Sequence, residues 1–289
     1  MDLAVIVIDQ IVTSIASLLL ISIGLAVIFG MMRVINLAHG EFIMLGGYTV
    51  VTAVNAGINL WVASLILAPL IVGVFGLVIE RTIIRFLYGR MIDTMLATWG
   101  LSLALVGAVT MIFGNTTSGV STPLGSMSFG RYELSNYNFA IIGIAALTTV
   151  ALFYALRFTR FGIIARATMQ NPQMVGSLGV NSAYVYAVTF AIGAALSGLA
   201  GGMIAPLSGV VPAMGGQYVA KAFITVISGG SGAVVAGTLS ASTVLGTLDT
   251  SMTFLTTPVF GEVSLLVGAV LLVRALPQGI TGRLFRGAI

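Results

Sequence analysis

Three polar residues stand close together in an otherwise apolar stretch, and their types and spacing could carry chemistry: Asn36, His39 and Glu41. An ionisable group inside a hydrophobic run is costly at the centre of a bilayer, so it usually faces a bundle interior or a water-filled path. If a helix begins at Arg33, Glu41 lies about 12 Å further along it. We therefore expect these three residues to line a translocation path, with polar bonding between helices as the alternative role.

The sequence gives little support for a catalytic function. The run GGSG at residues 229–232 resembles the serine motif of rhomboid intramembrane proteases, in which a later helix supplies the His that activates the serine. The single His of this chain, His39, precedes Ser231, and the chain has no Cys. The pattern GxxxxGK[ST], which would bind ATP, does not occur either. We expect no catalytic residue, no metal site and no cofactor.

The composition defines the broad class of protein. Hydrophobic residues make up 58% of the chain and charged residues 7%, whereas about a quarter of the residues in a soluble domain are charged. Asp2 and Asp9 stand where a signal peptide would be basic, so the first apolar run is expected to stay attached. The sequence therefore predicts an all-α polytopic membrane protein, with residues 1–289 forming a single transmembrane domain.

Apolar runs of roughly 20 residues are needed to cross a hydrocarbon core about 30 Å thick. Six such runs are clear, near residues 6–31, 35–54, 59–80, 94–114, 138–156 and 184–206. The second is interrupted by polar residues and glycines and could be a broken helix. Residues 218–228 cover half a span and, together with the run up to residue 248, predict a re-entrant hairpin. Residues 262–275 close a scheme of about seven crossings plus that hairpin.

The distribution of basic residues predicts the orientation. Only Arg131 and Lys221 fall on the predicted outer side. Lys and Arg favour the cytoplasmic side of a bacterial inner membrane, so we expect a periplasmic N-terminus and a cytoplasmic C-terminus. The longest outer segment, residues 115–138, is predicted to be a loop, either a contact surface for an extracytoplasmic partner or a simple connection. The basic residues on the predicted inner side are Arg33, Arg81, Arg85, Arg90, Arg157, Arg160, Arg166, Arg274, Arg283 and Arg286.

The longest charged interruption, residues 157–181, is expected to be cytoplasmic and to contain two short helices. The first covers about residues 161–170. The second has Asn171 as a candidate N-cap, Pro172 at its first position and Gly179 where a left-handed C-cap would fall. A helix of two turns is marginal alone in water, so we expect it to fold by docking against something.

Three segments carry a family resemblance. The run NPQMVGSLGVN resembles the cytoplasmic EAA-type loop of ATP-binding-cassette (ABC) importer permeases, in which a short coupling helix sits in a groove of the ATPase subunit. Residues 33–47, RVINLAHGEFIMLGG, and residues 272–283, LVRALPQGITGR, are similar to the branched-chain amino acid permease family, which also includes urea and amide permeases. Residues 91–105 and 259–273 look slightly closer to the urea and short amide branch.

The resemblance implies a permease subunit of the bacterial inner membrane that works by alternating access. Its partners would be ABC ATPase subunits that bind the ATP, a second permease subunit, a periplasmic substrate-binding protein and lipid, with no nucleic acid. A stand-alone channel or secondary transporter is the alternative; it would have charged ion-coupling residues near helix breaks. The implied ATPase-coupling residues are Arg166, Asn171, Pro172, Val175 and Gly179.

Small residues recur at every fourth position in the sixth apolar run, at Gly193, Ser197 and Gly201. A row of small side chains lets the backbone of another helix approach closely. We expect these residues to serve helix packing rather than ligand binding.

Overall fold

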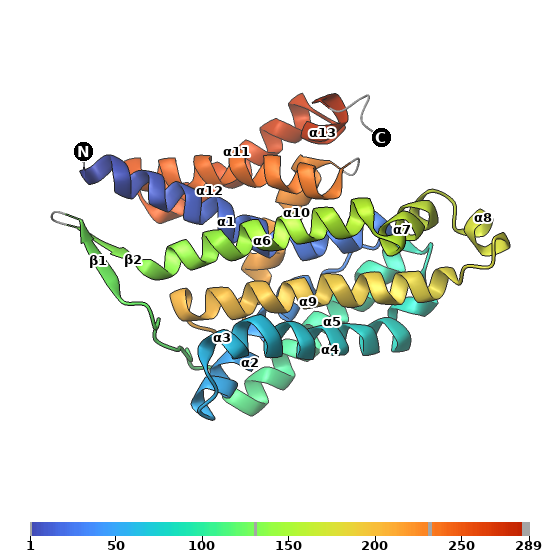
Figure 1. Cartoon of the computed structure of the whole chain (residues 1–289), viewed down its shortest axis with the longest axis horizontal. Coiled ribbons are helices and arrows are strands. Elements are labelled where there is room, and N and C mark those ends of the chain that lie inside the picture. The colour runs from blue at the N-terminus through green and yellow to red at the C-terminus, as the bar shows by residue number, and fades with distance from the viewer. Residues whose placement is uncertain (1, 130–131, 231–232, 285–289) are drawn as a thin grey trace.

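The computed structural model describes residues 2–129, 132–230 and 233–284, and these are almost wholly helical (Figure 1). Arg131, Ser231, Gly232 and Arg286, which the sequence analysis names, lie outside the described residues. The elements are α1 (Asp2–Met32), α2 (His39–Asn55), α3 (Leu60–Val62), the π-turn η1 (Ala63–Leu67), α4 (Ala68–Thr82), the 3₁₀ turn η2 (Ile84–Leu87), α5 (Met91–Phe113), β1 (Ser126–Phe129), β2 (Tyr132–Ser135), α6 (Asn136–Phe158), α7 (Arg160–Gln170), α8 (Pro172–Ser177), α9 (Ser182–Ser208), α10 (Gly215–Gly229), α11 (Val234–Leu255), α12 (Pro258–Ala275) and α13 (Gly279–Leu284).

The all-α polytopic fold is confirmed. Within the described residues, six helical segments are long and apolar enough to cross a membrane, and α10 with α11 would make a seventh if the pair counted as one bent span. The predicted runs match the observed helices to within a few residues. The last span begins at Pro258, not at Glu262, and this gives it the length to cross.

Two long helices, α1 and α9, form the centre of the bundle. Gly24 lies against Ser197 and Ile28 lies against Gly193, which shows that the two helices run antiparallel. Helices α2 and α4 pack on α9, and α10 and α11 pack on α1. A non-helical segment precedes both α2 and α10, and Gly40 at the start of α2 touches Gly215 at the start of α10. The starts of α2 and α10 thus meet between the two halves of the bundle, an arrangement that resembles the inverted repeats of many transporters.

Small residues permit the close approach of these helices. A methyl group on Gly193 would overlap Ile28 of α1, and one on Gly201 would overlap the carbonyl oxygen of Ile43 in α2. Ser197 lies between them, fully buried and next to Gly24. Gly193, Ser197 and Gly201 thus occupy the contacts of α9 with α1 and α2.

The condition used to calculate the depth of Glu41, a helix that begins at Arg33, is not met. Helix α1 ends at Met32, and α2 begins only at His39. Arg33 adopts a left-handed conformation with φ 53°, which terminates α1 because a residue there cannot continue the right-handed helix. The distance of Glu41 along a helix starting at Arg33 therefore has no structural meaning. Glu41 lies in the first turn of α2 and is nevertheless 2% exposed.

The expected re-entrant hairpin has a different form. Helices α10 and α11 meet at a bend of 112° and are unequal, with 15 and 22 residues. Helix α11 packs along α1 and α12, so it is a full-length member of the bundle and not the short arm of a hairpin. Helix α9 also runs two residues beyond Pro206, the expected end of its apolar run.

The two ends of the bundle differ (Figure 1). The strands β1 and β2, a two-stranded antiparallel sheet, lie at the end where α1 begins, which we call the hairpin end. Residues 115–138 are therefore not wholly a loop, and Ser118 also bridges to Val210. Helices α7 and α8 lie at the opposite end, which we call the α8 end.

Candidate functional site

Asn36 shapes the non-helical segment that leads into α2. Its Oδ1 atom accepts a hydrogen bond from the Ala38 N–H at 3.1 Å, and its carbonyl oxygen accepts one from the His39 N–H at 3.3 Å. The N–H of the neighbouring Leu37 donates to Thr98 Oγ1 of α5 at 3.1 Å. Asn36 is fully buried. Its observed contacts therefore fix the backbone before α2.

His39 joins the two central helices. Its Nε2 lies 2.8 Å from the Ile21 carbonyl oxygen of α1, and its Nδ1 lies 3.1 Å from Ser197 Oγ of α9. A carbonyl can only accept, so Nε2 carries the hydrogen of a neutral ring. The single hydroxyl hydrogen of Ser197 is shared between Nδ1 and the Gly193 carbonyl oxygen, which lies 2.9 Å from Oγ. Both ring nitrogens are then satisfied within the core, where His39 is fully buried.

Glu41 points to the other side of α2. Its Oε1 accepts a hydrogen bond of 2.6 Å from Ser102 Oγ of α5. Its Oε2 is buried and has no hydrogen-bond partner. The same oxygen lies against Gly215 at the N-terminus of α10. A buried polar atom without a partner is costly. Among the three predicted path residues, Asn36 Nδ2 and Glu41 Oε2 are both in this state. Glu41 Oε2, which lies against the start of α10, is the candidate acceptor for a ligand.

The structure therefore divides the predicted trio. Asn36 and His39 form backbone and interhelical bonds, while Glu41 faces α5 and α10 together with Ser102 and Gly215. Sequence reasoning missed Ser102 and Gly215. A signal for Gly215 exists, because Ala38–Gly40 and Ala213–Gly215 share the pattern Ala-x-Gly at the starts of α2 and α10.

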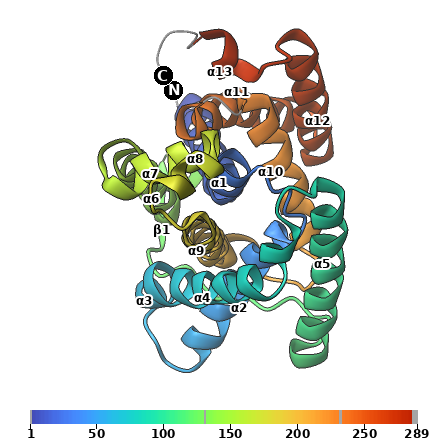
Figure 2. The same ribbon diagram turned by 90° about the vertical axis from the view of Figure 1, so that its right-hand side faces the viewer.

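Helices α5, α10 and α12 lie on one side of the bundle, which we call the α5–α10–α12 face (Figure 2). Helix α5 is the least buried of the candidate spans. Polar side chains occur on this face at α10 and α12: Gln217 is exposed, and Lys221 Nζ donates to Glu262 Oε1 at 2.7 Å. Exposed polar groups at helix positions within a membrane are costly in contact with lipid chains and usually face protein or water.

The side formed by η1, α6 and α9 has the opposite character. A groove of about 490 Å³ there is lined almost entirely by apolar residues. Such a surface suits lipid chains, since it presents little for water to bind. The groove residues are Leu65, Ile144, Leu147, Thr148, Ala151, Leu152, Ala155, Leu196 and Leu199.

The predicted helices of residues 157–181 are confirmed as α7 and α8. Asn171 is the N-cap of α8 and accepts a hydrogen bond from the Met174 N–H at 3.0 Å. Pro172 is the first helical residue, and Gly179 has φ 85°. Helix α8 packs on α7 and α9 within its own chain.

The side chains of this segment face two directions. Val175 is 7% exposed and turns toward the protein, whereas Met174 is 64% and Leu178 77% exposed. Arg166 is exposed and its Nη2 donates to the Arg157 carbonyl oxygen at 3.4 Å, which ties α7 to the end of α6. Met174 and Leu178, the outward apolar pair, are not among the predicted ATPase-coupling residues. The sequence could have indicated them, because they are two apolar residues one helical turn apart in a polar segment.

The described part of the chain contains no group of three or more His, Cys, Asp or Glu side chains placed to hold a metal ion. The long apolar helices, the contact between the starts of α2 and α10 and the buried, half-satisfied Glu41 instead define a transport protein of the membrane.

Comparison with known proteins identifies the family. Residues 7–276 match the family model described as "Branched-chain amino acid transport system / permease component", and the chain belongs to this family. The permease protein LivH of Salmonella typhimurium is 30% identical over 285 residues, covering 91% of each chain. LivH of Escherichia coli K12 is 28% identical over the same share of each chain. BraD of Pseudomonas aeruginosa is 30% identical over 232 residues, 74% of this chain and 75% of that one.

No solved structure matches the chain. Membership of the family, with the apolar helices, makes this chain the permease subunit of an importer and a multi-pass protein of the inner membrane.

Proposed function

We propose that this chain is the membrane subunit of an ATP-driven importer for branched-chain amino acids. The printed names of the relatives give that substrate class. Transport of urea or short amides, which parts of the sequence favour, stays a prediction. A branched-chain amino acid carries an ammonium group and an apolar side chain. Glu41 Oε2 offers an acceptor for the first, and an apolar cluster with Met44, Val109 and Met214 continues along the same helices for the second.

The orientation follows from the arginines. Eight of those assigned to the inner side precede residue 275 and fall where helices end or in the segments between them. The positive-inside rule then makes the α8 end cytoplasmic and the hairpin end periplasmic. In this orientation β1, β2 and the segment before them face a periplasmic binding protein that delivers the substrate.

The observation that carries the proposal is the form of α8. It is a capped helix of six residues at the arginine-rich end of the bundle, with exposed Met174 in its first turn and exposed Leu178 at its C-cap. Exposed apolar anchors one turn apart on a helix are the usual means of docking a helix into a groove. The groove would belong to a separate ATPase subunit, which binds and hydrolyses the ATP because this chain has no P-loop pattern.

A second permease subunit would cover the α5–α10–α12 face. Sites in transporters built from inverted repeats lie at the repeat interface, where interrupted helices begin. Gly40, Glu41 and Gly215 lie where α2 and α10 begin. The translocation path would therefore run between two copies or homologues of this chain, along the side to which Glu41 points.

Uptake by the reconstituted complex tests the proposal. The permease, its ATPase and its binding protein are placed in proteoliposomes, and the entry of labelled leucine, isoleucine, valine and urea is measured with and without ATP. We expect leucine, isoleucine or valine to accumulate only with ATP. Accumulation of urea alone would overturn the substrate class, and uptake without ATPase or ATP would favour a stand-alone transporter.

A further inference from the structure

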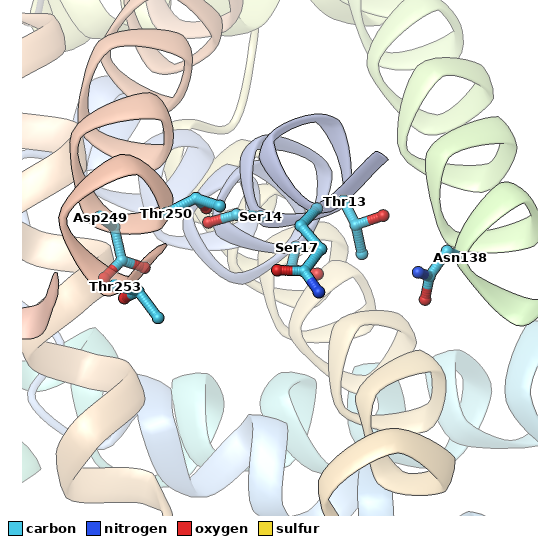
Figure 3. A pocket seen from close by; sticks show the side chains of 8 residues that line it. Thr13, Ser14, Ser17, Asn138, Asp249, Thr250 and Thr253 are labelled. Atoms are coloured by element: carbon cyan, nitrogen blue, oxygen red, sulfur yellow. The ribbon is translucent and has the colours of Figure 1, made fainter. Parts of the chain in front are cut away.

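A second polar site lies away from Glu41, in a pocket of about 270 Å³ at the hairpin end. It is open to the surface between α6 and α11, with α1 at its back. Figure 3 shows side chains of α11 on one side, Asn138 of α6 on the other, and side chains of α1 between them. All eight lining residues are polar: Gln10, Thr13, Ser14, Ser17, Asn138, Asp249, Thr250 and Thr253.

The polarity of this pocket is not a consequence of the architecture. The groove formed by η1, α6 and α9 shares α6 with this pocket, so a groove against α6 need not be polar. That groove contains one polar residue, Thr148. Polar side chains in a membrane helix are disfavoured unless they have partners. A wholly polar pocket therefore points to a polar occupant.

The charges around the pocket favour a cation. Asp249 is its only charged lining residue. The charged side chains near Asp249 are Lys221 and Glu262, and these two neutralise each other in a salt bridge of 2.7 Å. The three groups together keep one negative charge. An anionic or neutral occupant would leave that charge uncompensated.

The hydrogen-bonding groups favour an occupant that donates. Asn138 Nδ2 already donates to Asp9 Oδ2 at 2.8 Å, which leaves Asn138 Oδ1 as the free acceptor. Thr13 Oγ1 is buried and has no hydrogen-bond partner. The Asp249 carboxylate, which already has a hydrogen bond with Ser14, is the charged acceptor of the lining; it lies on the other side of the α1 side chains from Asn138 (Figure 3). A primary ammonium group supplies one positive charge and three donors.

Other cations fit less well. A Ca²⁺ or Mg²⁺ site needs more oxygen ligands at fixed distances than one carboxylate supplies, and the pocket is far larger than the ~30 Å³ of one water molecule. A quaternary ammonium has no N–H and prefers aromatic faces, and none of the lining residues is aromatic.

We propose that this pocket binds a primary ammonium group, supplied either by the ethanolamine headgroup of a phospholipid or by a free amino acid. The place of the pocket suits a headgroup. Asn138 is the third residue of α6 and Thr253 lies two residues before the end of α11, so both lie within one turn of the end of the bundle. The proposal does not rest on the transport function, because its test measures binding and not uptake.

The test compares lipid retention by native mass spectrometry on the purified full chain. Phosphatidylethanolamine and phosphatidylcholine with the same acyl chains are offered together, and the thermal midpoint is measured with added ethanolamine and leucine. We expect selective retention of phosphatidylethanolamine, reduced roughly tenfold by Asp249→Asn, since a hydrogen bond to a charged group is lost. Thr13→Val should reduce retention of phosphatidylethanolamine severalfold. This variant tests the pocket if Asp249→Asn does not fold. Thr243→Val on an exposed part of α11 and Asp93→Asn at the other end are the controls.

The outcomes distinguish the two sources. Retention of phosphatidylethanolamine that free amines do not displace identifies the headgroup. A rise in thermal midpoint with leucine that depends on Asp249 identifies the free amino acid. Equal retention of the two lipids together with no shift by any amine, or the same binding in wild type and both pocket variants, would overturn the proposal.

Discussion

The carboxylate of Glu41 lies against Gly215, so that a methyl group on Gly215 would overlap Oε2. Gly40 in turn lies on the carbonyl oxygen of Gly215. The start of α2 and the start of α10 therefore occupy one contact, and the position of either helix depends on the other. The contact also places a carboxylate at a helix N-terminus, where a negative charge is stabilised by about 0.3–1 kcal/mol.

Adding a methyl group at this contact should impair transport. Gly215→Ala must displace Glu41 or α10, and we expect it to lower stability by about 1–3 kcal/mol, the usual cost of overpacking. Gly216→Ala is the matched control, because a methyl group there meets nothing within 4 Å and alanine favours a helix by roughly 0.5–1 kcal/mol. Thermal unfolding and ATP-dependent uptake are measured on both. Equal behaviour of the two variants would show that the contact is dispensable.

Glu41 itself should matter for uptake more than for assembly. Glu41→Gln keeps the shape and removes the charge, and we expect lower uptake with normal yield of the complex. Glu41→Leu removes both acceptors and should abolish uptake. It also leaves Ser102 without its observed acceptor, a loss of about 1 kcal/mol. Normal uptake per assembled complex by the Leu variant would remove Glu41 from the path and assign it to packing.

Hydrophobic length predicted the helices well because each apolar run must cover a hydrocarbon core of about 30 Å. The caps of α8 were also predictable, since Asn171, Pro172 and Gly179 act through local backbone geometry. The break between α1 and α2 was not predictable from the sequence. Arg33 ends α1 in a left-handed conformation that glycine usually supplies, so no local signal marked it.

The site depended on contacts between distant residues. Ser102 is 61 residues from Glu41, and Ser197 is 158 residues from His39. Periodicity places a residue on a face of its own helix but does not say which helix that face meets. The trio Asn36, His39 and Glu41 was therefore predicted as one group, although the last two project from α2 toward different helices.

Charges on the outer side of α8 should uncouple ATP hydrolysis from transport. Leu178→Asp and Met174→Asp place a carboxylate where an apolar anchor is proposed, and we expect membrane levels to stay normal while substrate-stimulated ATP hydrolysis falls by at least tenfold, the effect of losing about 1.4 kcal/mol or more. Gln173→Asp, also exposed on α8, is the control. Full ATPase stimulation in both variants would reduce α8 to a connection.

The inward side of the same segment gives a different expectation. Val175→Asp buries a charge within the chain's own fold and should lower membrane levels, not coupling. Gly179→Pro removes the N–H that donates to the Gly176 carbonyl oxygen and opposes φ 85°, so it should disrupt α8 and uncouple transport. Gly176→Ala, which meets nothing within 4 Å, controls for the loss of a glycine. Transport by Gly179→Pro at the normal rate would contradict this view of α8.

His39 of α2 should help to hold the two central helices together, because it bonds both the Ile21 carbonyl oxygen of α1 and Ser197 of α9. Ser197→Ala removes the donor to Nδ1 and leaves a buried ring nitrogen unpaired, which costs about 1–2 kcal/mol. We expect a lower thermal midpoint in detergent. Ser208→Ala, at the exposed end of the same helix, should change stability by less than about 0.5 kcal/mol. A double-mutant cycle with His39→Leu isolates the pair, since each single variant removes the same bond. If the two effects simply add, His39 and Ser197 contribute separately, and their bond does not couple α2 to α9.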